Sequence, residues 1–353
     1  RIFLIGLFLR IIVMPFTFHW DLYALNIIAS EFIKHGPLAF YTSYIADYPP
    51  LTYLSLAVWQ LIIKPLTFSD FYQWLDLPSM VKFLSIHNAR YLFLLKTFYI
   101  PFDLGIAYIL GRFGRNENEK KLLSSLWLFN PIVLYVVFMW GTIDIVPTFF
   151  VLLSIYLIRT GKTYLPPILL SIGALFKLWP LLLIPYALVI ISSSWKKRVI
   201  SLVLCLLMSL LILLPYLRIG NFWTYVIFSD RASMIGNGGL YLGFSQWLLV
   251  YPFLYLIGLL YINRNYSGRP DKIIDICFIV LILFYITSAF TPQWFLWILP
   301  FFLLEVVRFP VLFKPFVLVL IGYGLVILTF DITLSLGLFG PLEPTLWQAP
   351  FIK

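Results

Sequence analysis

The feature that most restricts the fold is the length of the apolar segments and the placement of basic residues between them. Residues 122–158 contain one charged side chain, Asp144, and basic residues flank them at both ends. A helix of about 17–25 apolar residues can cross a membrane. Because basic residues favour the cytoplasmic side, the chain is expected to cross and return within this stretch, turning at residues 139–147.

This argument, applied along the chain, predicts an all-α polytopic membrane protein, with residues 1–353 as one integral membrane domain. The chain is 62% hydrophobic and 11% charged, whereas about 25% of residues are charged in soluble domains. We expect roughly eleven transmembrane helices, the first of them truncated because the chain begins inside an apolar run. The predicted spans are residues 1–16, 89–111, 122–140, 145–159, 164–177, 178–194, 199–217, 245–263, 272–290, 293–307 and 311–330.

Two large polar segments are expected on the extracytoplasmic, or lumenal, side. The first, residues 17–88, is predicted to contain interfacial helices, one of them at 51–67, because counting that helix as a span would place the basic segment 112–121 outside. The second is residues 218–244. The net charge of +10 comes from basic turns, so it predicts membrane orientation and does not indicate a nucleic-acid partner.

Four acids, Asp21, Asp47, Asp144 and Asp230, fall on this predicted outer face. Asp21 begins a segment with helical spacing of apolar residues, so it suits an N-cap, and it equally suits a general base at the membrane boundary. Asp144 occupies a tight turn and is either solvated there or buried with a partner. Asp103 lies inside a predicted span, where a charge needs a partner, and it could either cap the floor of the pocket or pair with Lys96 or Arg90.

Cations on the same face could bind a phosphate. Lys177 lies in the turn "FKLWP", and its long side chain could either snorkel to lipid headgroups or meet a lipid phosphate. Arg218 and Arg231 lie in the second outer segment, and a guanidinium group binds phosphate through paired hydrogen bonds. The sequence leaves open which of the three is used.

Several motifs resemble those of one family, the GT-C fold glycosyltransferases that use polyprenyl-phosphate-linked sugars. The run "DYPPLTYL" is similar to that of dolichyl-phosphate-glucose glucosyltransferases. The runs "GALFKLWPLLLIPY" and "FTPQWFLWILP" are more similar to the GPI mannosyltransferase I catalytic subunit and to bacterial polyprenol-phosphate-mannose-dependent mannosyltransferases. An acid soon after the first span and "NPIVLYVVFMWGTIDIVPTFFVLLSIYL" complete the resemblance, which extends to about residue 305.

The resemblance implies an inverting transfer of a hexose, mannose before glucose, to a hydroxyl group of a lipid-linked glycan or another membrane-surface acceptor. Asp21 matches the family's catalytic base, and Lys177, Arg218 and Arg231 are candidates for the donor phosphate. His19, Asp47, Tyr48, Asp144 and Gln293 are supporting pocket candidates. The family often has two acids as DxD where this chain has His19-Trp20-Asp21, which leaves a requirement for Mg²⁺ or Mn²⁺ open.

Two other classes remain to be weighed against the enzyme. A polytopic transporter or lipid flippase would account for many spans and for Asp103 at membrane depth, and a non-catalytic scaffold subunit is a third class. The gathering of acids on one face favours the enzyme, because a transporter needs polar groups along a path to both sides. Metalloprotease, P-loop, nucleophile-elbow and dinucleotide motifs in suitable context are absent from the sequence.

Overall fold

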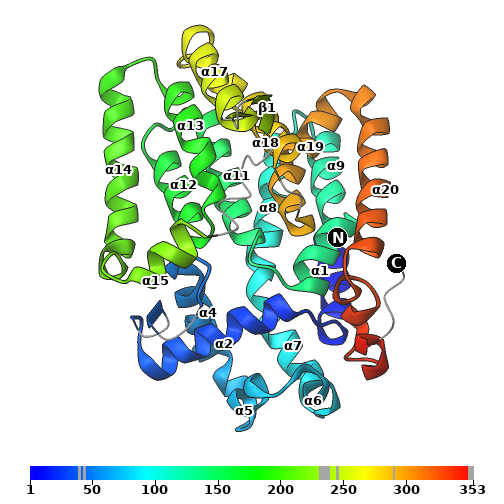
Figure 1. The fold of residues 1–353 in the computed structure, drawn as a ribbon. Coiled ribbons are helices and arrows are strands. Elements are labelled where there is room, and N and C mark those ends of the chain that lie inside the picture. The colour runs from blue at the N-terminus through cyan, green and yellow to red at the C-terminus, as the bar shows by residue number, and fades with distance from the viewer. Residues whose placement is uncertain (39–40, 43–44, 230–238, 244–245, 289–290, 349–353) are drawn as a thin grey trace. The chain divides into compact units, whose positions relative to one another are not determined.

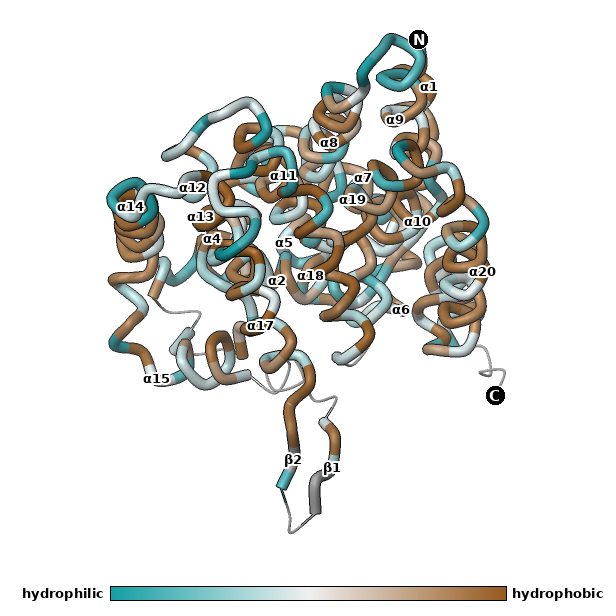
Figure 2. The backbone as a smooth tube through the Cα atoms, turned by 90° about the horizontal axis from the view of Figure 1, so that it is seen from above, coloured by the Kyte–Doolittle hydropathy of each residue, from teal (hydrophilic) through white to brown (hydrophobic). Residues whose placement is uncertain are grey.

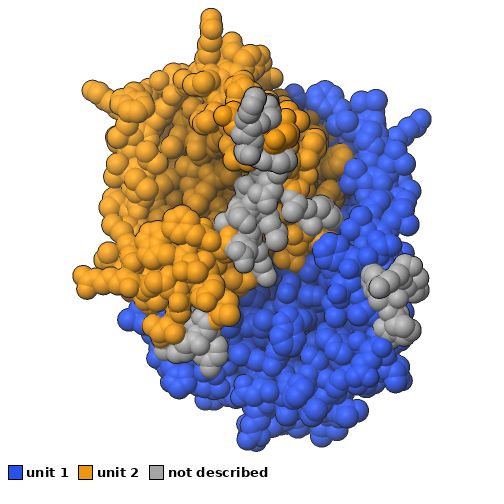
Figure 3. All heavy atoms as spheres, viewed as in Figure 1, with its two compact units in different colours: residues 1–40, 52–145, 306–353 blue, residues 41–51, 146–305 orange. Residues whose placement is uncertain are grey.

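The structure is a computed structural model that describes residues 1–38, 41–42, 45–229, 239–243, 246–288 and 291–348. These residues are predominantly helical, which confirms the all-α class (Figure 1). The chain divides into two compact units, shown in different colours in Figure 3. Unit 1 comprises residues 1–40, 52–145 and 306–353, and unit 2 comprises residues 41–51 and 146–305.

Unit 1 contains the N-terminal helices, most of residues 17–88 and the C-terminal helices. Its α-helices are α1 (Ile2–Val13), α2 (Trp20–His35), most of α4 (Pro50–Ile63), α5 (Phe71–Asp76), α6 (Ser79–Leu84), α7 (Asn88–Lys96), α8 (Ile100–Phe113), α9 (Glu117–Leu128), α10 (Pro131–Val133) and α20 (Phe313–Phe330). A π-helix, Leu134–Trp140, follows α10, and 3-10 helices at Ile332–Leu334, Leu336–Phe339 and Pro344–Gln348 follow α20.

A buried ion pair joins α1 to α8 within unit 1. The Arg10 guanidinium donates hydrogen bonds to both carboxylate oxygens of Asp103, and Trp127 Nε1 donates to Asp103 Oδ1 over 2.8 Å. The expected pairing of Asp103 with Lys96 or Arg90 is therefore wrong. The cation comes instead from the first apolar helix, and it compensates a charge that would be costly to bury alone.

Unit 2 contains the middle of the chain. Its α-helices are almost all of α11 (Ile145–Arg159), α12 (Leu165–Phe176), α13 (Ile184–Ile191), α14 (Trp195–Leu213), α15 (Gly220–Phe222), α17 (Val250–Asn265), α18 (Ile273–Thr287) and most of α19 (Phe295–Arg308). The strands β1 (Gly239–Gly243) and β2 (Gln246–Leu249) form an antiparallel hairpin, with Gly239 opposite Leu249. This hairpin is a departure from the purely helical expectation.

The described residues contain three helices long and apolar enough to cross a membrane, Asn88–Phe113, Trp195–Tyr216 and Pro310–Phe330. Two bent pairs bring the number to five if each is one span: Ile2–Phe16 with Trp20–His35, bent by 81°, and Glu117–Leu128 with Pro131–Trp140, bent by 40°. In Figure 2 the helices are largely hydrophobic and many of the hydrophilic segments are turns. These features support a membrane protein, and eleven spans are not confirmed.

The difference in span number comes from helix length, because six of the predicted spans contain α-helices of 16 residues or fewer: α11, α12, α13, α17, α18 and α19. Residues 164–194 contain α12, a 3-10 helix at Trp179–Leu183, and α13. The 12 residues of α12 measure about 18 Å at the rise of an α-helix, against about 30 Å of hydrocarbon in a bilayer. Pro180 lies between α12 and α13. Proline has no backbone N–H to donate, so it favours the end of the α-helix here. Hydropathy alone therefore does not decide which of the predicted spans are full-length helices.

Candidate active site

The Asp21 carboxylate is oriented by an indole from a distant part of unit 1. Helix α2 begins at Trp20, and its N-cap is His19, whose Nδ1 accepts a hydrogen bond from the Asp21 backbone N–H over 3.0 Å. Asp21 is consequently not the N-cap, contrary to the first expectation. Its Oδ2 accepts a hydrogen bond from Trp140 Nε1 over 3.0 Å, and its side chain is 30% exposed. The carboxylate is thus both fixed and accessible.

His19 lies beside this carboxylate as a buried, neutral ring. It is 7% exposed, and its ring centroid lies 4.8 Å from that of Trp140. Burial lowers the pKa of His19 and outweighs the opposing effect of the Asp21 charge. Because Nδ1 accepts a hydrogen bond, the proton of the neutral ring belongs on Nε2, which lies 3.4 Å from Thr333 Oγ1. His19 shapes the site and does not supply a positive charge.

This arrangement does not suit a metal ion shared by His19 and Asp21. Nδ1 of the histidine faces a backbone N–H, and Nε2 faces a hydroxyl group. Among the residues that the structure describes, no group of three or more His, Cys, Asp or Glu side chains could hold a metal ion. Two ligands alone do not make a divalent-cation site.

Lys96 ties together the two segments that carry Asp21 and Trp140. It is fully buried, and its ammonium group donates to the backbone oxygen of Thr17 over 2.6 Å, to that of Met139 over 3.1 Å and to Thr17 Oγ1 over 2.9 Å. Thr17 precedes the N-cap by two residues, and Met139 immediately precedes Trp140. A buried ammonium requires several acceptors, and here the acceptors fix the separation between the two segments.

The turn after the π-helix is also fixed in unit 1. Gly141 has φ = 89°, in the left-handed region where glycine carries no steric penalty, and a Cβ there would lie 3.2 Å from the Leu22 side chain of α2. Tyr99 donates its hydroxyl hydrogen bond to the Gly141 oxygen over 3.0 Å. Asp144 in this turn is completely buried. The expectation of a solvated Asp144 is therefore wrong, and the alternative of a buried acid remains.

Residues 331–348, which follow α20, pack around the loop that leads to Asp21. Thr333 donates to Asp331 Oδ1 over 2.6 Å while its hydroxyl faces His19. The backbone N–H of Phe18 donates to the Leu338 oxygen over 2.8 Å, and the Trp347 ring lies edge-on to Phe18 with centroids 5.5 Å apart. This segment therefore forms part of the wall behind the carboxylate.

Lys177 lies over aromatic rings in unit 2. Helix α12 ends at Phe176, and the next residue is extended. The Lys177 ammonium lies 5.2 Å from the Tyr48 ring centroid and 5.4 Å from that of Trp297. Trp297 itself stacks on Trp179 with centroids 5.0 Å apart. Cation–π attraction to two rings holds this charge next to an aromatic surface, an environment compatible with an apolar ligand that carries a phosphate.

The remaining candidates are distributed over unit 2. Gln293 is buried in the 3-10 helix Pro292–Trp294, and Asp47 is half-buried in the segment before α4. Arg218 is exposed between the end of α14 and α15. Arg231 lies outside the described residues. The structure thus brings His19 together with Asp21 in unit 1, and Tyr48 together with Lys177 in unit 2.

Sequence reasoning missed the residues that position Asp21. Trp140, Lys96 and Thr333 contact the site through hydrogen bonds across 119, 79 and 314 positions of the chain. A weak signal existed for two of them. Trp140 lies in the predicted outward turn 139–147, and Lys96 is a cation inside a predicted span, which requires a partner. Nothing in the sequence indicated Thr333.

The comparisons with known proteins give one partial similarity. Over 80 residues the chain is 34% identical to the GPI mannosyltransferase 1 of Candida albicans. The aligned segment covers 22% of this chain and 20% of the Candida protein. No family model matches the chain, and no solved structure matches it. Over about a fifth of its length, therefore, the chain is similar to a mannosyltransferase.

Proposed function

We propose that this chain is a membrane-embedded, mannosyltransferase-like glycosyltransferase. In this proposal it moves a hexose, with mannose preferred, from a polyprenyl-phosphate donor to a hydroxyl group of a lipid-linked glycan or another membrane-surface acceptor. The partial similarity to a mannosyltransferase supports the transferase class, and the apolar helices support a membrane location. The donor and the acceptor are inferred from the motif resemblance and from the chemistry of the candidate site.

The observation that carries the proposal is the environment of Asp21. A carboxylate used only as a helix cap would bond the backbone N–H groups of its own helix. In α2 that role belongs to His19, so the Asp21 carboxylate is available for another use. One of its oxygens is fixed by Trp140, and about a third of the side chain is open to a ligand. A positioned and accessible carboxylate is suited to general-base catalysis.

The proposed reaction is a direct displacement at the anomeric carbon. The acceptor oxygen forms a bond to that carbon while the bond from the carbon to the phosphate oxygen breaks, which inverts the configuration. Asp21 takes the proton of the acceptor hydroxyl. The leaving group is a phosphate, which departs as an anion and needs a positive charge more than a general acid. Lys177, Arg218 and Arg231 are the candidates for that charge.

A transporter or flippase remains the main alternative function, and the environment of Asp103 weakens one reason for it. Asp103 suggested an ionisable group in a transport path. Its carboxylate is fully buried and accepts hydrogen bonds from Arg10 and Trp127. A fully buried, neutralised pair suits a structural joint better than a proton or ion relay. The Asp21 environment favours the enzyme over both the transporter and a non-catalytic scaffold.

The proposal is tested by measuring sugar transfer in sealed membranes that contain the full chain. Polyprenyl-phosphate mannose, polyprenyl-phosphate glucose and GDP-mannose are supplied separately as labelled donors, and label is measured in the extracted glycolipids. We expect transfer from polyprenyl-phosphate mannose, with an inverted anomeric linkage. Transfer from none of the donors by a folded protein, together with accelerated lipid exchange between leaflets, would contradict the enzyme and favour the flippase.

A further inference from the structure

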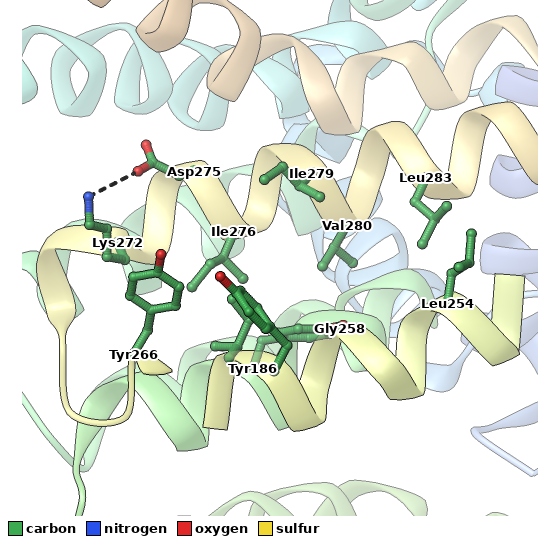
Figure 4. Close-up of a pocket in the computed structure, with 12 residues that line it drawn as sticks. Tyr186, Leu254, Gly258, Tyr266, Lys272, Asp275, Ile276, Ile279, Val280 and Leu283 are labelled. Carbon is green, nitrogen blue, oxygen red and sulfur yellow. Dashed lines mark ion pairs between the residues drawn. The ribbon is translucent and has the colours of Figure 1, made fainter. Parts of the chain in front are cut away.

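Unit 2 contains a second site, a groove between α17 and α18 with a volume of about 340 Å³ (Figure 4). Its apolar wall comes from both helices: Leu254, Gly258, Ile262, Ile276, Val280 and Leu283. Ile276 and Leu283 are seven positions apart, which corresponds to about 10 Å of helix. The groove is therefore elongated along the helices, a form that suits a hydrocarbon chain better than a compact ligand.

The base of the groove is formed by Tyr186 of α13. Its hydroxyl group donates a hydrogen bond to the Tyr255 oxygen over 2.7 Å, so this polar atom is satisfied by protein. A Cβ at Gly258 would lie 2.9 Å from the same hydroxyl oxygen. The missing side chain at Gly258 therefore lets the ring fit under α17. At the base of the groove the Tyr186 ring is an aromatic surface, and its hydroxyl hydrogen is already bonded within the protein. Such a base again suits an apolar occupant.

One end of the groove carries charges of both signs. Lys272 Nζ lies 3.8 Å from Asp275 Oδ2, and the two side chains are 32% and 28% exposed. Figure 4 shows this pair and Tyr266 at one end, and Leu254 and Leu283 at the other. The Tyr266 ring lies 6.0 Å from that of Tyr261, inclined by 63°. The mouth thus offers a cation, an anion and two phenol rings.

The surroundings identify the groove as open to lipid. Leu254 and Ile279, which line it, are 40% and 63% exposed, and residues 245–263 and 272–290 are predicted spans. Arg264 and Arg269 are close in sequence to Tyr266 and Lys272, which lie at the mouth of the groove. By the positive-inside rule, these basic residues place the mouth at the cytoplasmic leaflet. A membrane lipid can therefore reach this site by lateral diffusion.

We infer that this groove binds a zwitterionic phospholipid, with an acyl chain along the apolar wall and the headgroup at the mouth. Lys272 is the partner for the lipid phosphate. Asp275 and the faces of Tyr261 and Tyr266 are partners for the headgroup ammonium. A lipid with a net negative headgroup would satisfy Lys272 but would be repelled by Asp275. This site does not depend on the proposed sugar transfer.

The apolar half of the inference is tested by filling the groove. The full chain is purified in detergent, loaded with phosphatidylethanolamine, and its bound lipid is counted by native mass spectrometry. Ile279→Trp places a large ring in the groove and is expected to lower occupancy about tenfold, equivalent to ~1.4 kcal/mol. Ile286→Trp is the matched control, because Ile286 lies on the same helix, is 76% exposed and does not line the groove. Equal occupancy in the two variants would overturn the inference.

The headgroup half is tested by competition between phosphatidylethanolamine and phosphatidylglycerol. We expect the wild-type protein to retain phosphatidylethanolamine preferentially, Asp275→Asn to shift the preference towards phosphatidylglycerol, and Lys272→Gln to weaken the binding of both. Melting temperatures of the variants in detergent show that each is folded before its occupancy is compared. Wild-type binding without preference, or a preference unchanged in Asp275→Asn, would show non-selective annular lipid and would overturn the assignment.

Discussion

At the scale of single residues, the role open to the Asp21 carboxylate depends on which side chain caps the N-terminus of α2. Asp and His both precede the first apolar turn, and His19 takes the capping position through its Nδ1. The Asp21 carboxylate then turns to Trp140. His19 and Asp21, on either side of Trp20, thus divide the structural and the proposed chemical role between them.

Trp140 is expected to be a positioning residue for Asp21. Trp140→Phe keeps an aromatic, though smaller, ring at this buried position and removes the N–H donor to the carboxylate. We expect kcat for sugar transfer to fall on the order of tenfold, because a misplaced base loses rate quickly, while KM for the donor changes little.

Trp127→Phe is the control for this substitution. Trp127 donates its Nε1 hydrogen bond to a different buried carboxylate, Asp103, so its loss should reduce stability and leave kcat of the folded protein unchanged. Equal kcat for Trp140→Phe and the wild-type protein would show that the Trp140 hydrogen bond does not position Asp21 for catalysis.

Lys177 is expected to contribute to binding of the donor phosphate. Lys177→Gln removes the charge and should raise KM for the polyprenyl-phosphate donor about tenfold, whereas Lys177→Arg should retain much of the affinity. Lys162→Gln, at an exposed basic turn, is the control for a general loss of positive charge. An unchanged KM in Lys177→Gln would assign the phosphate to one of the two arginines.

The sequence could predict Asp21 and not its partners for a physical reason. An acid directly after an apolar helix is a local pattern, visible within a few residues. The hydrogen bonds from Trp140 and to Thr333 join segments 119 and 314 positions apart, and such pairings depend on tertiary packing. The mistaken cap at Asp21 has the same origin, because the sequence does not reveal which of two neighbours turns its side chain to the backbone.

At the scale of elements, apolar runs predicted the helices, but they did not show which helices are long enough to cross a membrane. The predicted span 311–330 corresponds to the helix Pro310–Phe330. The predicted span 122–140 instead corresponds to α9, a break at Asn130, and a π-helix ending at Trp140. Asn130 caps the next turn by accepting the Ile132 N–H, and Pro131 begins it. Hydropathy does not reveal such a break, because one polar residue and one proline barely change the mean hydropathy of a long apolar segment.

The joint between α1 and α8 allows a test of the buried ion pair. Arg10→Met leaves Asp103 as an uncompensated buried charge, which should destabilise unit 1 by about 3–5 kcal/mol. Adding Asp103→Leu should recover most of this loss, because an apolar pair costs no desolvation. Thermal unfolding in detergent compares the two single variants with the double variant. A double variant as unstable as Arg10→Met alone would contradict this account of the joint.

At the scale of the whole molecule, composition and basic turns were sufficient to predict a helical membrane protein. The hairpin β1–β2 was not foreseen, because its strands are short and lie within the loop 218–244 and the start of a predicted span. The division into two units was not foreseen either, since it depends on which helices pack together. The chain enters unit 2 for residues 41–51 before it returns to unit 1.

Orientation can be tested with two single-cysteine positions separated by the helix Asn88–Phe113. Ile86 is 90% exposed, and Asn118 is exposed in the first turn of α9. We expect Ile86→Cys to react with a membrane-impermeant maleimide from the extracytoplasmic side, and Asn118→Cys only after the membrane is opened. The native Cys205 and Cys277 are buried and give a low background. Labelling of both positions from one side would mean that this helix does not cross the membrane.

The measurement that tests the central claim most directly is sugar transfer by Asp21→Asn from polyprenyl-phosphate mannose. Asparagine keeps the size of the side chain and can still accept the Trp140 hydrogen bond, but it cannot take a proton. We predict a loss of about a hundredfold or more in kcat, the scale of a missing general base. Asp76→Asn, at a 57% exposed acid in the same outer segment, should transfer at the wild-type rate. Equal transfer by Asp21→Asn would contradict the account and direct attention to Asp47 or Asp144 as the base.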